Sequence, residues 1–268
     1  MSARAYELFA VPLRAARRAS VVWALCLGAL IGLTVAFYPA FRDQPDLSSL
    51  VEGMPDALVQ AFGLSDFGTP AGFLRGNLYA VLVPLALAIA GVLLMNGQTA
   101  SDEDSGRMEA YLAQPVSRGA VFWGRVLAVC AWLAVIGLVM FAVQFASNQA
   151  FGVDIGTDRV AETIALCILL AAFHAGVAAA LAGLTGRPGL VLAAGMAIAV
   201  FGYVAIALFP ISDVLAPWRH ASPWDWALGG DPLIHRTELW RYLALGLPAV
   251  LLFAIGAIGF GRRDVRAA

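Results

Sequence analysis

Six long apolar runs divide this chain, and they constrain its fold more than any other feature. Each run is long enough to cross the roughly 30 Å hydrocarbon layer of a bilayer as a helix, and none contains Asp, Glu, Lys or Arg. Because a membrane-spanning backbone must satisfy its own hydrogen bonds, runs of this kind fold as helices. The sequence predicts an all-α membrane protein in which residues 1–268 form a single transmembrane domain. Its six transmembrane helices are expected at residues 20–38, 78–95, 126–145, 163–184, 189–209 and 243–260.

The composition excludes several other classes of protein. Hydrophobic residues make up 61% of the chain and charged residues 13%, whereas charged residues are about 25% of a soluble domain. The net charge of −1 argues against a nucleic-acid partner. Cys26, Cys130 and Cys167 each lie inside an apolar run, which predicts neither a disulfide framework nor a metal site.

The distribution of charge predicts the orientation in the membrane. If the N-terminus is cytoplasmic, the inner segments hold eleven of the 17 arginines and six of the 18 acids, a net charge of +5. The outer segments then carry a net charge of −6. Basic residues are enriched on the cytoplasmic side of membrane proteins. We therefore expect a multi-pass protein of the bacterial cell membrane with both termini in the cytoplasm.

The first 19 residues read as an amphipathic helix. Tyr6, Phe9 and Leu13 share one face of a helical wheel, and arginines share another. Amphipathic segments of this kind lie at a membrane surface, so we expect residues 1–19 to form an interfacial helix. The alternative is a basic flank that only orients the first span. The segment is not expected to be a signal peptide, since the apolar run that follows is too long and has no small-residue cleavage site.

Two outer connections carry weaker signals. Residues 42–76 are acidic, and apolar positions within 54–63 predict a short helix. Residues 210–242 contain four tryptophans and several prolines. Tryptophan favours the headgroup layer and proline interrupts helices, so we expect short re-entrant pieces before the sixth span. These pieces would form either an outer gate or only an aromatic belt.

The most polar passage, residues 101–118, follows the second span. Three consecutive acids, Asp102, Glu103 and Asp104, come first, and Ser101 with Asp104 matches the pattern that caps a helix N-terminus. An apolar stripe then recurs at helical spacing, and a proline follows. The sequence predicts one short helix here, with a stripe formed by Met108, Tyr111 and Leu112 and an end at Pro115. Such a helix cannot bury its apolar face alone, so we expect it to meet a soluble partner.

Several activities lack their required residues. The chain has no lysine and hence no phosphate-binding loop of the Gly-x-x-x-x-Gly-Lys-Ser/Thr type. It has neither His-Glu-x-x-His nor Gly-x-Ser-x-Gly, so no catalytic residues, metal ligands or cofactor are expected on this chain. His174 is the one titratable histidine within a span, and a neighbouring carbonyl is a simpler partner for it than a proton relay. An ATP-independent carrier and a membrane-embedded enzyme stay open as alternatives, although each lacks the polar residues it would need.

The polar passage and the later segments together resemble a known family. Residues 103–118 read Glu-Asp-Ser-Gly-Arg-Met-Glu-Ala-Tyr-Leu-Ala-Gln-Pro-Val-Ser-Arg, and Arg125 opens the third span. This passage is similar to the inner loop of permease subunits of bacterial ABC type-2 exporters, with acids, Gly-Thr-Leu-Glu-x-Leu-Leu and then Pro-Val-Ser-Arg. Residues 222–233 and 260–264 are similar to the later segments of the same family. Arg107 replaces the usual threonine and Tyr111 a leucine, which could alter the contact surface for a partner.

The resemblance implies a division of labour between chains. Two permease copies, expected to be identical, would surround a central path, and cytoplasmic ATP-binding cassette subunits would bind ATP and Mg. The coupling helix would contact those ATPases through Asp102, Glu103, Asp104, Gly106, Met108, Glu109, Tyr111, Leu112, Pro115 and Arg118. A lipophilic or amphipathic cargo such as a drug, an antibiotic or a lipid would leave the cytoplasm along a path that could include His174, Phe201 and Tyr203.

Overall fold

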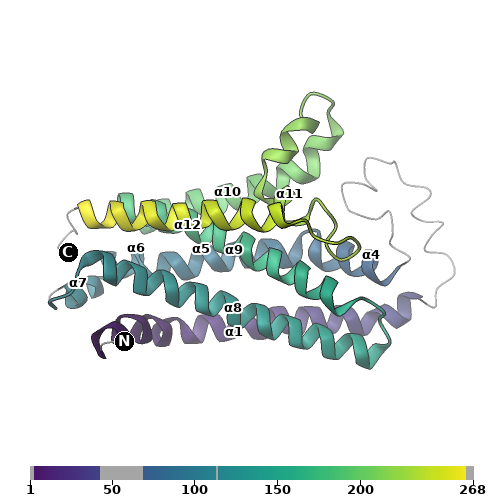
Figure 1. The fold of residues 1–268 in the computed structure, drawn as a ribbon, viewed down its shortest axis with the longest axis horizontal. Helices are drawn as coiled ribbons and strands as arrows, with labels where there is room; N and C mark the ends of the chain where they lie inside the picture. The colour runs from purple at the N-terminus through teal and green to yellow at the C-terminus, as the bar shows by residue number, and fades with distance from the viewer. Residues whose placement is uncertain (1–2, 43–68, 113, 264–268) are drawn as a thin grey trace.

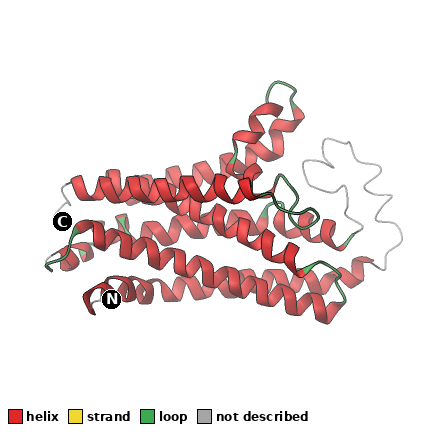
Figure 2. Ribbon diagram, viewed as in Figure 1, coloured by secondary structure: helices red, strands yellow, loops and turns green. Residues whose placement is uncertain are grey.

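The computed structural model describes residues 3–42, 69–112 and 114–263. Within these ranges every regular element is helical and no strand occurs (Figure 2). Six helices are long and apolar enough to cross a membrane, which confirms the expected number of spans. The short helix expected at residues 54–63 lies outside the described residues.

The described residues form helices in the following order along the chain. Their bounds are α1 Ala3–Arg42, α4 Pro70–Leu74, the π-helix η1 Arg75–Tyr79, α5 Leu82–Gln98, α6 Ala100–Asp104, α7 Arg107–Leu112, α8 Arg118–Phe151, α9 Thr157–Thr185, α10 Pro188–Leu208, the 3-10 helices η2 Phe209–Ile211 and η3 Ala216–Ala221, α11 Pro223–Leu228 and α12 Leu239–Arg262. The two termini lie at the same end of the bundle as α6 and α7 (Figure 1), and we call this the α6–α7 end. The opposite end, which carries α4 and α11, is called the α11 end.

Helix α9 occupies the centre of the bundle and packs against α5, α8, α10 and α12. Glycines allow its closest contacts. A Cβ added to Gly91 of α5 would stand 2.4 Å from the carbonyl oxygen of Ala171, and one added to Gly183 would stand 2.0 Å from that of Gly256. Small residues let membrane helices approach until their backbones touch. Spans two, four and six therefore form a closely packed layer.

The N-terminal segment is the beginning of α1 and not a separate helix. Pro12 lies inside α1. Because proline has no backbone N–H, it cannot donate the usual helical hydrogen bond to the Leu8 carbonyl, which lies against Gly124 of α8. Two side chains of other helices donate hydrogen bonds to carbonyls in this part of α1. Gln98 Nε2 donates to Pro12 O at 3.0 Å, and Trp132 Nε1 donates to Leu13 O at 2.8 Å. The helix thus continues through the proline, and its contact with a membrane surface stays a prediction.

The segment before the last span consists of short helical pieces, as expected. Part of it projects from the side of the bundle next to α11 (Figure 1). Trp224 of α11 is fully buried, and a Cβ on Gly202 of α10 would stand 2.7 Å from its Cδ1. Ser222 Oγ donates to the Gly202 carbonyl at 2.8 Å. Trp224 is thus a core residue, whereas Trp218 is 65% exposed, as a belt residue would be.

Candidate functional site

The polar passage begins within helical structure. Helix α5 ends at Gln98, the helical structure is interrupted at Thr99, and α6 begins directly after it. The hydroxyl of Thr99 donates to Met95 O at 2.6 Å, and the Ser101 hydroxyl accepts a hydrogen bond from Asn96 Nδ2 at 3.1 Å. Ser101 lies inside α6, so the predicted capping role of Ser101 is wrong, because helical structure already precedes it and its oxygen is used by Asn96.

Two helices occupy the place of the single predicted one. Gly106 has a φ of +71°, a left-handed conformation that glycine adopts without steric cost, and it separates α6 from α7. Helix α7 ends at Leu112, before Pro115 as predicted. Ser117 then begins α8 as its N-cap, since its hydroxyl accepts a hydrogen bond from the Ala120 N–H at 3.2 Å.

The apolar stripe of α7 packs against its own chain. Met108 is 1% exposed and belongs to the core of the bundle, while Tyr111 and Leu112 pack partly buried against that core. The predicted stripe is therefore real, but Met108 is covered by this chain and unavailable to a partner in this conformation. Exposed on the same passage are Asp104, Ser105, Arg107, Glu109, Gln114, Pro115 and Ser117.

Asp102 connects α6 to α8 through a buried arginine. Arg125, 1% exposed, forms an ion pair with Asp102 through Nη1 at 2.5 Å and donates to the Gln98 carbonyl. Its guanidinium carbon lies 4.8 Å from the centre of the Tyr111 ring, a cation–π arrangement. Asp102 also pairs with Arg107 at 2.7 Å, but the Arg107 side chain is 63% exposed.

Glu103 connects α6 to the end of α12. Its carboxylate accepts two hydrogen bonds from Arg263 at 2.6 and 2.5 Å, and the Glu103 side chain is only 5% exposed. Arg263 Nε also donates to the Gly183 carbonyl of α9 at 3.3 Å. Arg118 of α8 donates to the Arg263 carbonyl at 2.7 Å. The bidentate pairing of the Arg263 guanidinium with the Glu103 carboxylate has a defined geometry.

These five charged residues, Asp102, Glu103, Arg118, Arg125 and Arg263, form what we call the α6 network. Removing one partner of a buried ion pair leaves an uncompensated charge and costs about 3–5 kcal/mol. Consequently α6 is fixed relative to α8, α9 and α12. The network holds the segment between the second and third spans against three transmembrane helices.

The three residues considered for a path have different surroundings. His174 of α9 is buried and its Nδ1 lies 2.8 Å from the Leu170 carbonyl, as expected for a histidine satisfied within its own helix. Phe201 is 63% exposed on α10. Tyr203 packs on Trp224, with ring centres 5.4 Å apart, and is the only one of the three that lines the cavity between α9, α10 and α11. The structure therefore does not bring these residues to one site.

Comparison with known families decides the identity of this arrangement. The model of the ABC-2 family transporter proteins matches residues 8–223, which include α1 to η3 and the whole polar passage. The chain belongs to this family. It is an ABC-2 permease and a multi-pass membrane protein, which confirms the resemblance inferred from the polar passage. Comparison with curated proteins finds no match.

Some residues of the α6 network in this ABC-2 permease could be anticipated and others could not. From the sequence, Asp102, Glu103 and Arg118 were expected in the coupling segment, and Arg125 was part of the family resemblance. The pairing of Glu103 with Arg263 was missed, since 160 positions separate them and no local pattern joins them. Among the described residues, no group of histidine, cysteine and acidic side chains could hold a metal ion.

Proposed function

We propose that this ABC-2 permease is the transmembrane subunit of an ATP-driven exporter. A separate ATP-binding cassette subunit would bind ATP and Mg and dock from the cytoplasm on the passage from α6 to α8. The observation that carries this proposal is the α6 network, because it joins the exposed passage to spans three, four and six. An inner loop without a mechanical role would not need two ion pairs with buried members.

The proposed contact surface is the exposed side of α6 and α7. Arg107 and Glu109 present opposite charges there, while Met108 faces the core. Closure of the ATPases would displace α7, and Gly106 provides a joint at which α7 can change its angle to α6. The Glu103–Arg263 pair would carry the displacement to α12, and the Asp102–Arg125 pair would carry it to α8.

The proposed transport path lies between two copies of this chain. Spans α1, α10 and α12 are the least buried within one copy and expose large apolar side chains, among them Leu33, Phe201 and Leu251. Such faces suit lipid or a second copy in the membrane. The apolar runs 20–38 and 189–209 carry no acid or arginine, which supports a lipophilic or amphipathic cargo such as a drug, an antibiotic or a lipid, moved out of the cytoplasm.

The proposal is tested by purifying the chain alone and together with a candidate ATP-binding cassette subunit from the same organism. We expect no ATPase activity from the chain alone and activity from the complex, in which nucleotide should drive export from vesicles. Arg107→Glu should reduce the ATPase activity of the complex about tenfold, as expected for loss of roughly 1.4 kcal/mol at the contact.

The matched control is Arg187→Glu. Arg187 is also exposed and lies in the connection between α9 and α10, so the same change of charge occurs outside α6 and α7. The control complex should retain its activity. Equal activity of the two variant complexes would show that the ATPase does not contact α7.

A further inference from the structure

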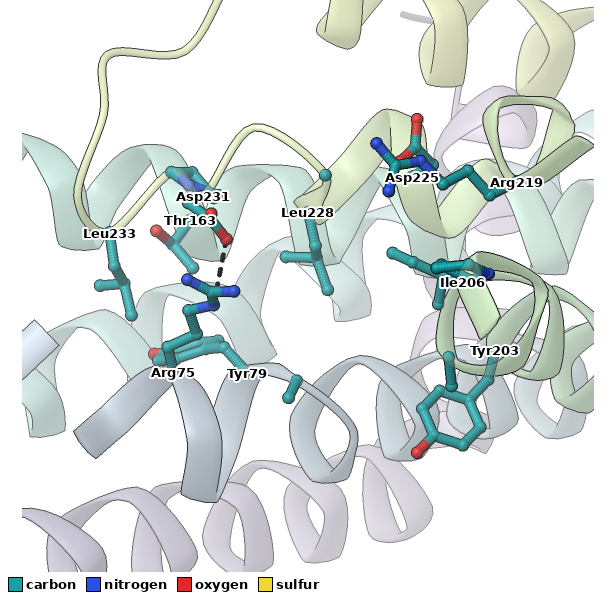
Figure 3. A pocket seen from close by; sticks show the side chains of 15 residues that line it. Arg75, Tyr79, Thr163, Tyr203, Ile206, Arg219, Asp225, Leu228, Asp231 and Leu233 are labelled. Carbon is teal, nitrogen blue, oxygen red and sulfur yellow. Dashed lines mark ion pairs between the residues drawn. The ribbon is translucent and has the colours of Figure 1, made fainter. Parts of the chain in front are cut away.

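A cavity of about 320 Å³ lies at the α11 end (Figure 3), far along the bundle from the α6 network. Its walls come from η1, α9, the end of α10, η3, α11 and the loop that follows α11. Polar and apolar residues share the lining: Arg75, Tyr79, Thr163, Tyr203, Ile206 and Leu228 are among them. The cavity has the size of a small ligand or a headgroup, at the lower end of the usual range for binding pockets.

Three of the four ionic groups that line this cavity already have a partner. Arg75 pairs with Asp231 at 3.0 Å at one end, as the dashed line in Figure 3 shows. Asp225, at the other end, pairs with His220 at 2.9 Å. Both carboxylates of the lining therefore have partners within the protein. Within the described part of the chain, neither aspartate of the lining is without a hydrogen-bond partner.

Arg219 is different, because its guanidinium has no hydrogen bond or ion pair with any residue in the described part of the chain. It lies at the same end of the cavity as Asp225 and is partly buried (Figure 3). An arginine presents five N–H donors in a fork that matches the oxygens of phosphate or carboxylate. Arg219 therefore has unused N–H donors that an oxyanion in this cavity could accept.

An exposed apolar surface adjoins the cavity at Pro210, which is one of its lining residues. Around it the end of α10, η2 and the following turn expose large apolar side chains: Leu208 is 52% exposed, Ile211 55% and Val214 79%. A ligand with a charged head in the cavity and an apolar tail would place that tail on this surface. The cavity with Arg219 and the apolar surface beside it together fit an amphiphile.

We propose that this cavity binds the phosphate group of an anionic amphiphile, with Arg219 as its cationic partner. The phosphate would occupy the cavity beside Arg219, and its acyl chains would lie outside along Leu208, Ile211 and Val214. Under the orientation predicted from the arginines, the site faces the headgroup layer of the outer leaflet. The inference does not depend on ATP coupling, so its test and that of the proposed function can fail separately.

The experiment measures lipid retained by the intact protein. The purified full chain is delipidated in a neutral detergent, supplied with phosphatidylglycerol, and examined by native mass spectrometry for bound lipid. Phosphatidylcholine is supplied in parallel as a lipid without net charge. Arg219→Gln should lower the retained phosphatidylglycerol about tenfold, as expected for loss of one charge-assisted hydrogen-bonded contact. Arg236→Gln is the matched control, because Arg236 is an exposed arginine of the same connection between α10 and α12 and does not line the cavity.

Competition with inorganic phosphate distinguishes the two sources of the group. If phosphate does not displace phosphatidylglycerol from the wild type, the ligand is the amphiphile, with the apolar surface contributing to binding. Displacement at equal concentration would support the same phosphate site with a soluble anion as its ligand. Equal retention of phosphatidylglycerol by Arg219→Gln and the wild type would overturn the proposal. Because Arg219 has no partner among the described residues, that variant should fold normally.

Discussion

The two ends of the bundle differ in how far their charged residues are buried and paired. At the α6–α7 end, buried arginines and acids pair with one another and join helices that are distant in sequence, as Glu103 and Arg263 do. At the α11 end, Trp224 packs on Gly202, Arg75 and Asp231 form a more exposed pair, and the guanidinium of Arg219, beside a cavity, has no partner among the described residues. Paired charge fixes the position of a segment, whereas unpaired charge beside empty space provides a place for a ligand.

This difference suggests a different role for each end. The α6 network fixes the segment between the second and third spans against the bundle, as the proposed coupling role requires. The Arg75–Asp231 pair of the α11 end is more exposed than the Arg125–Asp102 pair, and its loss should cost less stability. Variants that compare the two ends, or paired and unpaired sites within one end, can test this contrast.

The largest expected effect comes from breaking the buried pair of α6 and α8. Arg125→Met keeps a long side chain but leaves Asp102 with only the exposed Arg107 as a partner. We expect a loss of about 3–5 kcal/mol in the free energy of unfolding, visible as a large fall in Tm in detergent. Adding Asp102→Asn to this variant should recover part of the loss. An unchanged Tm in the single variant would show that the pair does not hold α6.

Helix packing near the same end should come next. Gly183→Ala would place a Cβ 2.0 Å from the Gly256 carbonyl oxygen, so α9 and α12 must separate. Such overpacking costs about 1–3 kcal/mol, and the Tm of the purified protein should fall accordingly. Gly246→Ala on α12 is the control, because no atom lies within 4 Å of its added Cβ. Alanine favours helix over glycine, so the control should keep or raise the Tm.

The ion pair at the α11 end should contribute less than its counterpart in the α6 network. The side chains of Arg75 and Asp231 are 21% and 32% exposed, and solvent weakens the attraction between charges in such a pair. Arg75→Gln should therefore lower the free energy of unfolding by about 1 kcal/mol or less. A fall in Tm as large as that of Arg125→Met would contradict the proposed contrast between the ends.

The smallest effect is expected at Arg107, within the α6–α7 end itself. Its side chain is 63% exposed, and exposed ion pairs contribute only a few tenths of a kcal/mol. Arg107→Gln should leave the Tm of the isolated chain nearly unchanged. Any loss of ATPase activity in the complex would then report on contact with the partner. A substantial fall in Tm would instead assign Arg107 a structural role.

Much of the fold could be predicted because membrane spans have a strong local signal. The apolar runs ending near Tyr38, Met95 and Phe260 are recognisable without any knowledge of tertiary contacts, and Pro115 correctly marked where α7 cannot continue. Helical periodicity also identified the stripe of Met108, Tyr111 and Leu112. It could not say what covers that stripe, because a partner and the chain's own core require the same apolar pattern.

What could not be predicted depends on residues far apart in sequence or on competition between local patterns. Ser101 matches a capping motif, but the preceding helix resumes after Thr99 and the motif is not used. Nothing near Trp224 distinguishes it from Trp218, yet Gly202 of another span leaves room for the first and not the second. The Glu103–Arg263 pair likewise exists only once the helices have assembled.

Arg263 follows directly after α12, and its position affects how the protein can be handled. Its side chain bonds to Glu103 and Gly183, and its carbonyl bonds to Arg118. A protein truncated after Arg262 would therefore lose the hydrogen bonds through which Arg263 joins four helices. Arg263 should therefore be kept in any truncated version of the protein, and an affinity tag should follow Arg263 and not replace it.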